Sequence, residues 1–181
     1  MNPDTARGAE YLNFHIGVLR SRRISEWHPI VENFVHSQLL PRLAPDALAT
    51  LESHRSAGHR MAMVRASNSV LVGALGRVLN IHTISSEVEI EADHATGRTL
   101  GLPSFREHEV DRVEGWPGLP LDCDPILESH FYSDSANDIP LLMAVSHPVA
   151  VNPDAKLSAL AEQNGWPQRS WRAKHRHGRH F

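Results

Sequence analysis

The sequence predicts an α/β fold built as a doubly wound parallel sheet. Short apolar segments typical of buried strands alternate with longer segments whose apolar residues recur at helical spacing, and this alternation favours a parallel sheet covered by helices. The 181 residues, of which 41% are hydrophobic, are enough to build one core. Short polar side chains also follow one predicted strand directly, which is where ligands bind in open parallel sheets.

Helical spacing dominates the first third of the chain. Ile30, Val31 and Phe34 recur along one face of a predicted helix, and this apolar face requires a packing partner. The helices expected here cover residues 9–19, 25–40 and 46–54.

Strands and helices alternate through the remainder. The segment that ends at Val64 is apolar throughout, as a buried strand would be. Pro153 near the start and Gly165 just past the end delimit the last helix. Strands are expected at 60–64, 81–84, 130–132 and 148–151, helices at 68–79, 105–116 and 153–164, and a β-hairpin over 87–100 with its turn at 93–97.

The segment FYSDSANDIPLL, residues 131–142, carries the most specific chemical signal. It places Asp134 where a predicted strand gives way to a helix, with Asp138 one helical turn further along. Two carboxylates at the carboxyl end of a parallel strand suit a hard cation such as Mg²⁺. The same residue types also cap helices, so a turn that only caps is an equal alternative on spacing alone.

This segment, with HPVAVNPD and LSALAEQNGWPQRSW after it, resembles the end of a haloacid dehalogenase-like (HAD) hydrolase of the phosphoserine-phosphatase-like branch. The resemblance extends from about residue 10 to residue 171. It implies a Rossmann-like fold and hydrolysis of a small phosphorylated metabolite. It also implies that Asp134 and Asp138 complete a Mg²⁺ site beside an aspartate nucleophile.

The front of the chain departs from this family. Members open with an apolar strand ending in Asp-x-Asp, whereas this chain opens with MNPDTARGAEYLNFHIGVL, which resembles a cap helix. We therefore expect an N-terminally truncated member that lacks the central first strand and the catalytic nucleophile. The Asp-x-Asp at 122–124 follows the Pro- and Gly-bearing stretch WPGLPL, so we interpret it as a loop and helix start. The expected regions are a partial helical cap with bridging helices over 1–57, the α/β core over 58–171, and a basic, His-rich, disordered tail over 172–181.

The expected phosphate site is degenerate. Arg65, followed by Ala66, stands where the family has a Ser or Thr, with Ser67 two residues later, and Glu109 stands where it has a Lys. An anion in place of a cation turns attraction for phosphate into repulsion of about 1 to 4 kcal/mol per charge pair at ~4 Å. Arg65 and Glu109 either pair with each other in the phosphate pocket that the resemblance implies or point separately to solvent.

These departures predict a phosphatase that is inactive as written. The alternatives are a noncatalytic pseudophosphatase or binding module, and a fragment completed by another chain. Loss of a central strand leaves two rows of backbone donors and acceptors without partners, so we expect reduced stability, re-pairing of the flanking strands, self-association or a strand-donating partner.

Composition excludes several other classes of protein. Eighteen Lys and Arg against 21 Asp and Glu give a net charge of −3, which provides no general attraction to nucleic acid or to a membrane. The single Cys123 forms no internal disulfide, and the start lacks the pattern of a signal peptide, so a cytoplasmic location is expected. Most of the thirteen histidines, His54 and His59 among them, show no shared ligand spacing. The tail carries His175, His177 and His180. These residues are typical of weak metal or anion binding, but a solvated tail is the favoured interpretation.

Overall fold

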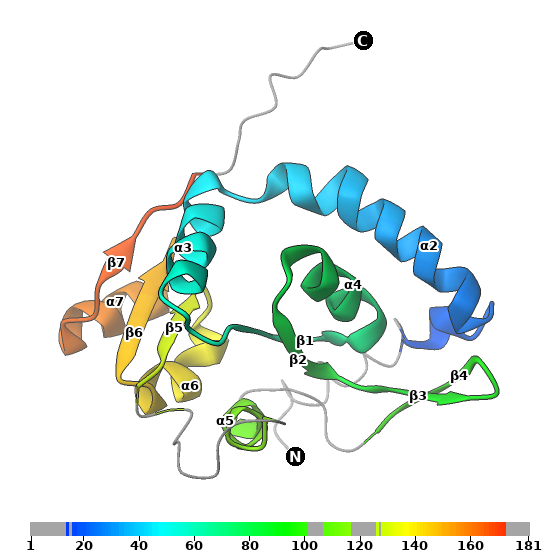
Figure 1. Ribbon diagram of the computed structural model, residues 1–181. Coiled ribbons are helices and arrows are strands. Elements are labelled where there is room, and N and C mark those ends of the chain that lie inside the picture. Colours follow the sequence, from blue (N-terminus) through cyan, green and yellow to red (C-terminus); the bar gives the residue numbers. More distant parts are fainter. Residues whose placement is uncertain (1–13, 15, 101–106, 117–125, 127, 173–181) are drawn as a thin grey trace.

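The computed structural model describes residues 14, 16–100, 107–116, 126 and 128–172. In this part of the chain, helices and parallel strands alternate as the sequence predicts (Figure 1). The strands form two parallel sheets and one antiparallel hairpin. The bounds are β1 (Ala62–Asn68) and β2 (His82–Ser86), then β3 (Val88–Glu91) and β4 (His94–Thr99), and finally β5 (His130–Ser133), β6 (His147–Val151) and β7 (Gln168–Arg169).

Helix α2 packs against α4 on the β1–β2 half of the molecule, whereas α3 lies beside β5. Helix α2 (Ile24–Phe34) continues into a π-helical segment, Val35–Leu39, and a short 3₁₀ segment, Leu40–Arg42, before α3 (Pro45–Ser56). Long helices change geometry where a crowded or proline-bearing turn interrupts regular bonding, and Pro41 lies two residues after the end of the π-helical segment. The resulting core joins the N-terminal helices to α4 and the hairpin; its buried residues are Ile16, Leu19, Ile24, Val31, Val35, Val70, Ala74, Val88 and Ala95.

Helix α4 (Ser69–Leu79) connects β1 to β2, and its sequence fixes both of its ends. The side chain of Asn68 accepts a hydrogen bond from the backbone N–H of Leu71, which caps the first turn. Asn80 ends the helix in the left-handed conformation. Because Gly76 has no side chain, the helix lies close to β2 beside Thr83. These features confirm the predicted helix at 68–79.

The hairpin turns earlier than the sequence suggests. Its two turn residues are Ala92 and Asp93, both with positive φ, rather than the segment 93–97. Asp93 accepts hydrogen bonds from the backbone and hydroxyl of Ser25, and the backbone N–H of Ile24 bonds to the Asp93 carbonyl. These contacts with the start of α2 stabilise a turn conformation that Ala alone disfavours.

The C-terminal half forms the second parallel sheet, in the order β5–β6–β7. Helix α6 (Ile139–Ala144) follows β5 through a short 3₁₀ turn, Ala136–Asp138, and α7 (Ala155–Asn164) follows β6. Asp154 caps α7 and Gly165 ends it with a positive φ. The buried residues between the sheet and these helices are Leu142, Ala150, Leu157 and Ala161.

The two parallel sheets lie apart from each other. Among the described residues, β1 pairs with β2 and β5 pairs with β6, and no ladder joins β1 to β5. Predicted re-pairing of these flanking strands is therefore not seen in this part of the chain. Helix α5 (Glu107–Glu114) contributes Val110 and Val113 to an apolar cluster with Val64 of β1 and Phe131 of β5. Side-chain packing thus connects the two sheets.

Candidate functional site: the acidic turn after β5

The acidic turn, residues 133–138, is held by its own hydroxyl groups. The buried hydroxyl of Ser133 donates to a carboxylate oxygen of Asp138 at 2.5 Å and accepts from the backbone N–H of Ser135 at 3.0 Å. The hydroxyl of Ser135 accepts from the backbone N–H of Asn137 at 3.1 Å. Asp134 is exposed at the end of β5, whereas Asp138 is half-buried. Ser135 therefore caps the short 3₁₀ segment Ala136–Asp138, whereas no side chain caps α6 itself, and the turn also presents a carboxylate to solvent.

Asp154 joins this turn to the next helix. One of its carboxylate oxygens accepts from the backbone N–H of Ala136 at 2.7 Å, and the other accepts from that of Leu157 in the first turn of α7 at 2.8 Å. Its own N–H donates to the carbonyl of Asp134 at 3.0 Å. Hydrogen bonds from these backbone N–H groups lower the pKa of Asp154, so it stays ionised near neutral pH.

Arg65 lies within β1, not in the turn after it. The expected strand ended at Val64, but β1 continues to Asn68. Val64 pairs with Ile84 and Asn68 pairs with Ser86, so four steps along β1 match two steps along β2. The two additional residues form an irregularity that re-aims side chains, as β-bulges do. Ser67 lies inside this irregularity, two residues beyond Arg65.

The charge of Arg65 in β1 acts on the acidic turn that follows β5. Burial raises the pKa of Asp138, the Ser133 hydroxyl and the positive charge of Arg65 lower it, and the negative charge of Asp134 raises it, with a net rise. The positive charge of Arg65 therefore favours the ionised form of Asp138, but it does not outweigh the effect of burial.

The remaining predicted positions give a mixed result. Ala66 lies in β1, where its carbonyl accepts from the buried hydroxyl of Ser86 at 3.0 Å. Glu109 belongs to α5, but its side chain lies outside the described residues, so its pairing with Arg65 stays a prediction. The Asp-x-Asp at 122–124 and the tail histidines likewise lie outside the described part of the chain.

The donors at the acidic turn fit part of a magnesium site. Mg²⁺ commonly takes one or two protein carboxylates and completes its six ligands with water and substrate phosphate. Asp134 and Asp138 interact electrostatically and supply two carboxylates at one edge of the sheet. Among the described residues, no cluster of three acidic, His or Cys side chains is arranged to hold a metal ion.

Asp138→Asn is expected to stabilise the fold at neutral pH. The folded state raises the pKa of Asp138 above its ordinary 3.8, so the ionised carboxyl costs folding free energy above that pH and the cost disappears below it. An amide oxygen still accepts from Ser133 and carries no charge. We expect a gain of up to about 1 kcal/mol at pH 7 after allowance for solvent screening, and no gain near pH 3.

Urea unfolding of the Asp138→Asn variant and the parent at both pH values measures this effect. Asp46→Asn, an exposed aspartate on α3, is the matched control and should change stability by less than about 0.5 kcal/mol. A lower stability of the Asp138→Asn variant at pH 7 would contradict the expectation.

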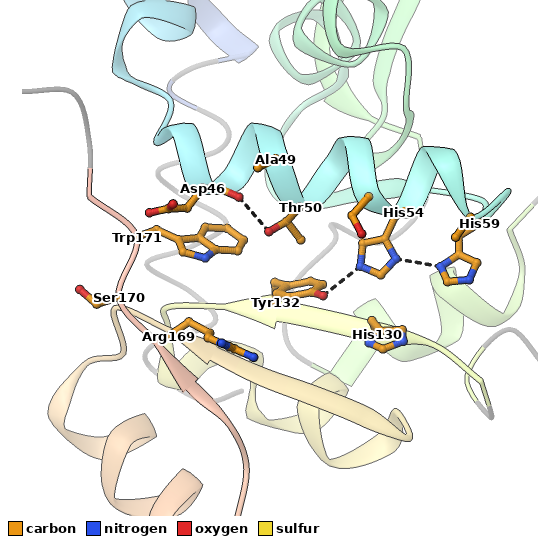
Figure 2. Close-up of a pocket in the computed structure, with 12 residues that line it drawn as sticks. Asp46, Ala49, Thr50, His54, His59, His130, Tyr132, Arg169, Ser170 and Trp171 are labelled. Atoms are coloured by element: carbon orange, nitrogen blue, oxygen red, sulfur yellow. Dashed lines mark hydrogen bonds between the residues drawn. The ribbon is translucent and has the colours of Figure 1, made fainter.

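A second feature, which the sequence did not reveal, is a histidine cluster made by His54, His59, His130 and His147. His54 and His59 share a hydrogen bond of 2.8 Å between their Nδ1 atoms, and Nε2 of His54 bonds to the Tyr132 hydroxyl at 2.9 Å (Figure 2). The rings of His130 and His147 stack with centroids 4.5 Å apart. His54 and His59 are near neighbours in sequence, but His130 and His147 are remote from them, and the packing of α3 beside the paired strands β5 and β6 brings the four together.

His54, His59 and His130 of the cluster line one end of an open pocket of about 710 Å³ between α3 and β5 (Figure 2). The other end holds Trp171, whose ring stacks on Tyr132 with centroids 5.7 Å apart. Arg169 of β7 and Asp46 of α3 also line it.

The described helices include none long and apolar enough to cross a membrane.

Comparison with known proteins identifies the family. The profile of the haloacid dehalogenase-like hydrolases matches residues 5–143. A histidinol-phosphatase of Neisseria meningitidis is 32% identical over 162 residues, which are 87% of this chain and 72% of that protein. Other curated relatives, which include a phosphoserine phosphatase of Mycobacterium tuberculosis, match over only about half of their length.

Solved structures show the same fold. A protein of unknown function from Bordetella pertussis superposes with a TM-score of 0.81 at 36% identity, covering 88% of this chain and 73% of that one. A phosphoserine phosphatase structure with a phospho-aspartyl intermediate analogue superposes with a TM-score of 0.56 at 15% identity, covering 91% and 72%. With the acidic turn, the parallel sheets and the matched profile all in agreement, the chain belongs to the haloacid dehalogenase-like hydrolase family.

Proposed function

We propose that this chain carries a phosphatase fold whose phosphate site is altered, so that the 181-residue polypeptide alone does not hydrolyse phosphomonoesters. The observation that carries this proposal is the cation Arg65, which lies within β1 and whose charge acts on the half-buried Asp138. The family resemblance implies a neutral hydroxyl at that position. A positive charge that already acts on Asp138 opposes the binding of a metal cation by the same carboxylate, because both are positive.

Mg²⁺ and a small phosphorylated metabolite are the ligands that we propose for the acidic turn. Asp134, which is exposed, and Asp138, which is half-buried, would hold the ion. A bound Mg²⁺ supplies neutralisation of phosphate charge, which is a large part of catalysis in phosphoryl transfer. The chain's own contribution is the rigid turn: Ser133 and Asp154 hold Asp138 and the backbone of Ala136 in fixed positions.

The chemistry of the reaction also requires a nucleophile in line with phosphorus. A strand end provides the rigidity that holds such a group within a few tenths of an ångström. The sole Asp-x-Asp in the 181 residues, at 122–124, follows a Pro- and Gly-bearing stretch instead of an apolar strand. A noncatalytic binding module therefore fits these residues better than an enzyme that acts alone.

Complementation by another polypeptide is a second candidate. It is favoured by the facing strands β1 and β5, which share no ladder within the described residues. An added strand would bond to two rows of backbone groups at once and could bring a carboxylate beside Asp134. Titration with a synthetic strand peptide, followed by a phosphatase assay, tests this candidate directly.

Phosphate release from p-nitrophenyl phosphate, with and without Mg²⁺, tests the main proposal. We expect no release by the 181-residue polypeptide above the level of its Asp134→Asn variant, because the Asp-x-Asp at 122–124 follows a Pro- and Gly-bearing stretch and not an apolar strand. We also expect calorimetry to detect weak Mg²⁺ binding that Asp134→Asn removes and that the control Asp46→Asn preserves. Mg²⁺-dependent release that disappears in the Asp134→Asn variant would overturn the proposal.

A further inference from the structure

Helix α3 is attached to its surroundings in an unusual way. None of its twelve residues is buried, so it lacks the apolar anchoring that holds α2 and α4. Its side-chain hydrogen bonds to the rest of the described chain are made by His54, to His59 and Tyr132, and by Arg55, to the carbonyl of Leu79. The ring contacts of the histidine cluster are therefore a main part of what keeps α3 beside β5.

The histidine cluster brings four ionisable rings into mutual contact. The His54 ring lies 5.0 Å from that of His130 and 5.1 Å from that of His59, and His59 and His130 stack at 6.2 Å. His147 stacks on His130 from the neighbouring strand. Neutral rings tolerate this arrangement, since each pair then interacts as aromatic or hydrogen-bonded groups. Each added proton places a positive charge against the other rings.

The charged groups around the cluster do not neutralise such protons. Glu52 of α3 is already paired with Arg55 at 2.7 Å. Asp46 lies at the opposite end of α3. Arg169 of β7 is itself positive and acts on Tyr132, whose burial raises its pKa and keeps it uncharged. Burial and then the charge of His59 lower the pKa of His54, and burial and then the charges of His147, His54 and His59 lower that of His130.

We propose that the histidine cluster is an acid-sensitive latch, which holds α3 against β5 while its rings are neutral and releases α3 when they are protonated. The hydrogen bond between His54 and His59 tolerates one added proton, because a neutral ring still offers an acceptor nitrogen to a protonated partner. With both rings doubly protonated, neither offers an acceptor, so this bond is lost and two positive charges lie in contact. Release widens the pocket between α3 and β5 and uncovers Tyr132.

The direction of the pH effect follows from proton linkage. The latched state lowers the pKa of His54 and of His130, so it binds fewer protons than the released state. Latching is therefore strongest above the ordinary histidine value of 6.5 and weakens as the pH falls through and below it. The opening equilibrium should rise by up to about tenfold per pH unit for each linked proton.

Hydrogen–deuterium exchange of the full chain between pH 7.5 and 5.5 tests the latch. Rates are corrected for the pH dependence of intrinsic exchange. We expect amides of α3 to lose protection as the pH falls, whereas amides of α7, a histidine-free helix in the same chain, keep theirs. His54→Gln retains an amide that can bond to the Tyr132 hydroxyl but cannot take up a proton, so the pH dependence of α3 should fall by about one linked proton. His82→Gln, outside the cluster, should leave it unchanged.

Three results would overturn the proposal. They are protection of α3 that does not vary with pH, equal loss of protection in α3 and α7, and a His54→Gln variant with the parent's pH dependence. The first two need only the unmodified chain, so the test stands even where a variant fails to fold.

Discussion

Leu142→Ala is expected to lower the free energy of unfolding by about 2 to 5 kcal/mol. Leu142 is 0% exposed and packs with Ala150 of β6 and with Leu157 and Ala161 of α7. Alanine leaves a cavity among side chains that are themselves fully buried, and small neighbours such as Ala150 cannot expand to fill it. Equilibrium denaturation in urea measures the loss.

Met143→Ala is the matched control, because Met143 is the next residue on the same helix and is 57% exposed. It should change stability by less than about 0.5 kcal/mol. Helix α6 begins directly after Asp138, so the loss at Leu142 also weakens the support of the acidic turn. Equal effects of the two substitutions would show that the packing of α6 is not as described.

Gly76→Ala is expected to destabilise the protein by about 1 to 3 kcal/mol, although alanine is the better helix former. A Cβ at Gly76 would lie 2.3 Å from the Thr83 methyl carbon and 3.0 Å from the carbonyl oxygen of Ile81. The second contact is to backbone, so α4 must move away from β2. That movement would shift β1, and with it Arg65, since β1 and β2 share a ladder.

Gly73→Ala on the same helix gives the opposite sign. Its nearest atom would be a guanidinium nitrogen of Arg77 at 3.7 Å, which is an ordinary contact. Alanine there removes the conformational entropy cost of glycine, and a gain of about 0.5 to 1 kcal/mol is expected. Thermal unfolding of the two variants side by side checks the pair. A stabilising Gly76→Ala would contradict the close approach of α4 to β2.

The sequence predicted elements well where local signals agree with packing. The helix at 68–79 has a capping Asn68 before it and Asn80 after it, and the structure confirms both ends within a residue. The helix at 153–164 is confirmed from Ala155, with Gly165 after it. The acidic turn was found because short polar residues follow an apolar strand, which is a local pattern.

Two misjudgements have a common cause. The end of β1 was placed at Val64, but pairing with β2 extends the strand through an irregularity to Asn68. The hairpin turn was placed at 93–97, but contacts of Asp93 with Ser25 fix it at Ala92 and Asp93. In both cases a partner remote in sequence decides the local conformation, and propensity carries no information about that partner.

The histidine cluster was missed for the same reason. His54 and His59 are five residues apart, but His130 and His147 join them only through the parallel pairing of β5 with β6. A search for ligand spacing finds sites whose residues lie on one element, whereas this cluster draws on α3 with the residues after it, on β5 and on β6. Tertiary contacts therefore bring the four histidines together, and the sequence shows only that the chain contains thirteen histidines.

The carboxylate of Asp154 links the segment that follows β5 to the helix that follows β6. Asp154 spans from the first turn of α7 to the backbone of Ala136, so neither the helix nor the preceding loop is free to change its register alone. A substitution of Asp154 would therefore alter the geometry of Asp134 and Asp138, although neither of these residues is changed. Divergence within such a domain is therefore constrained at a position outside the acidic turn itself.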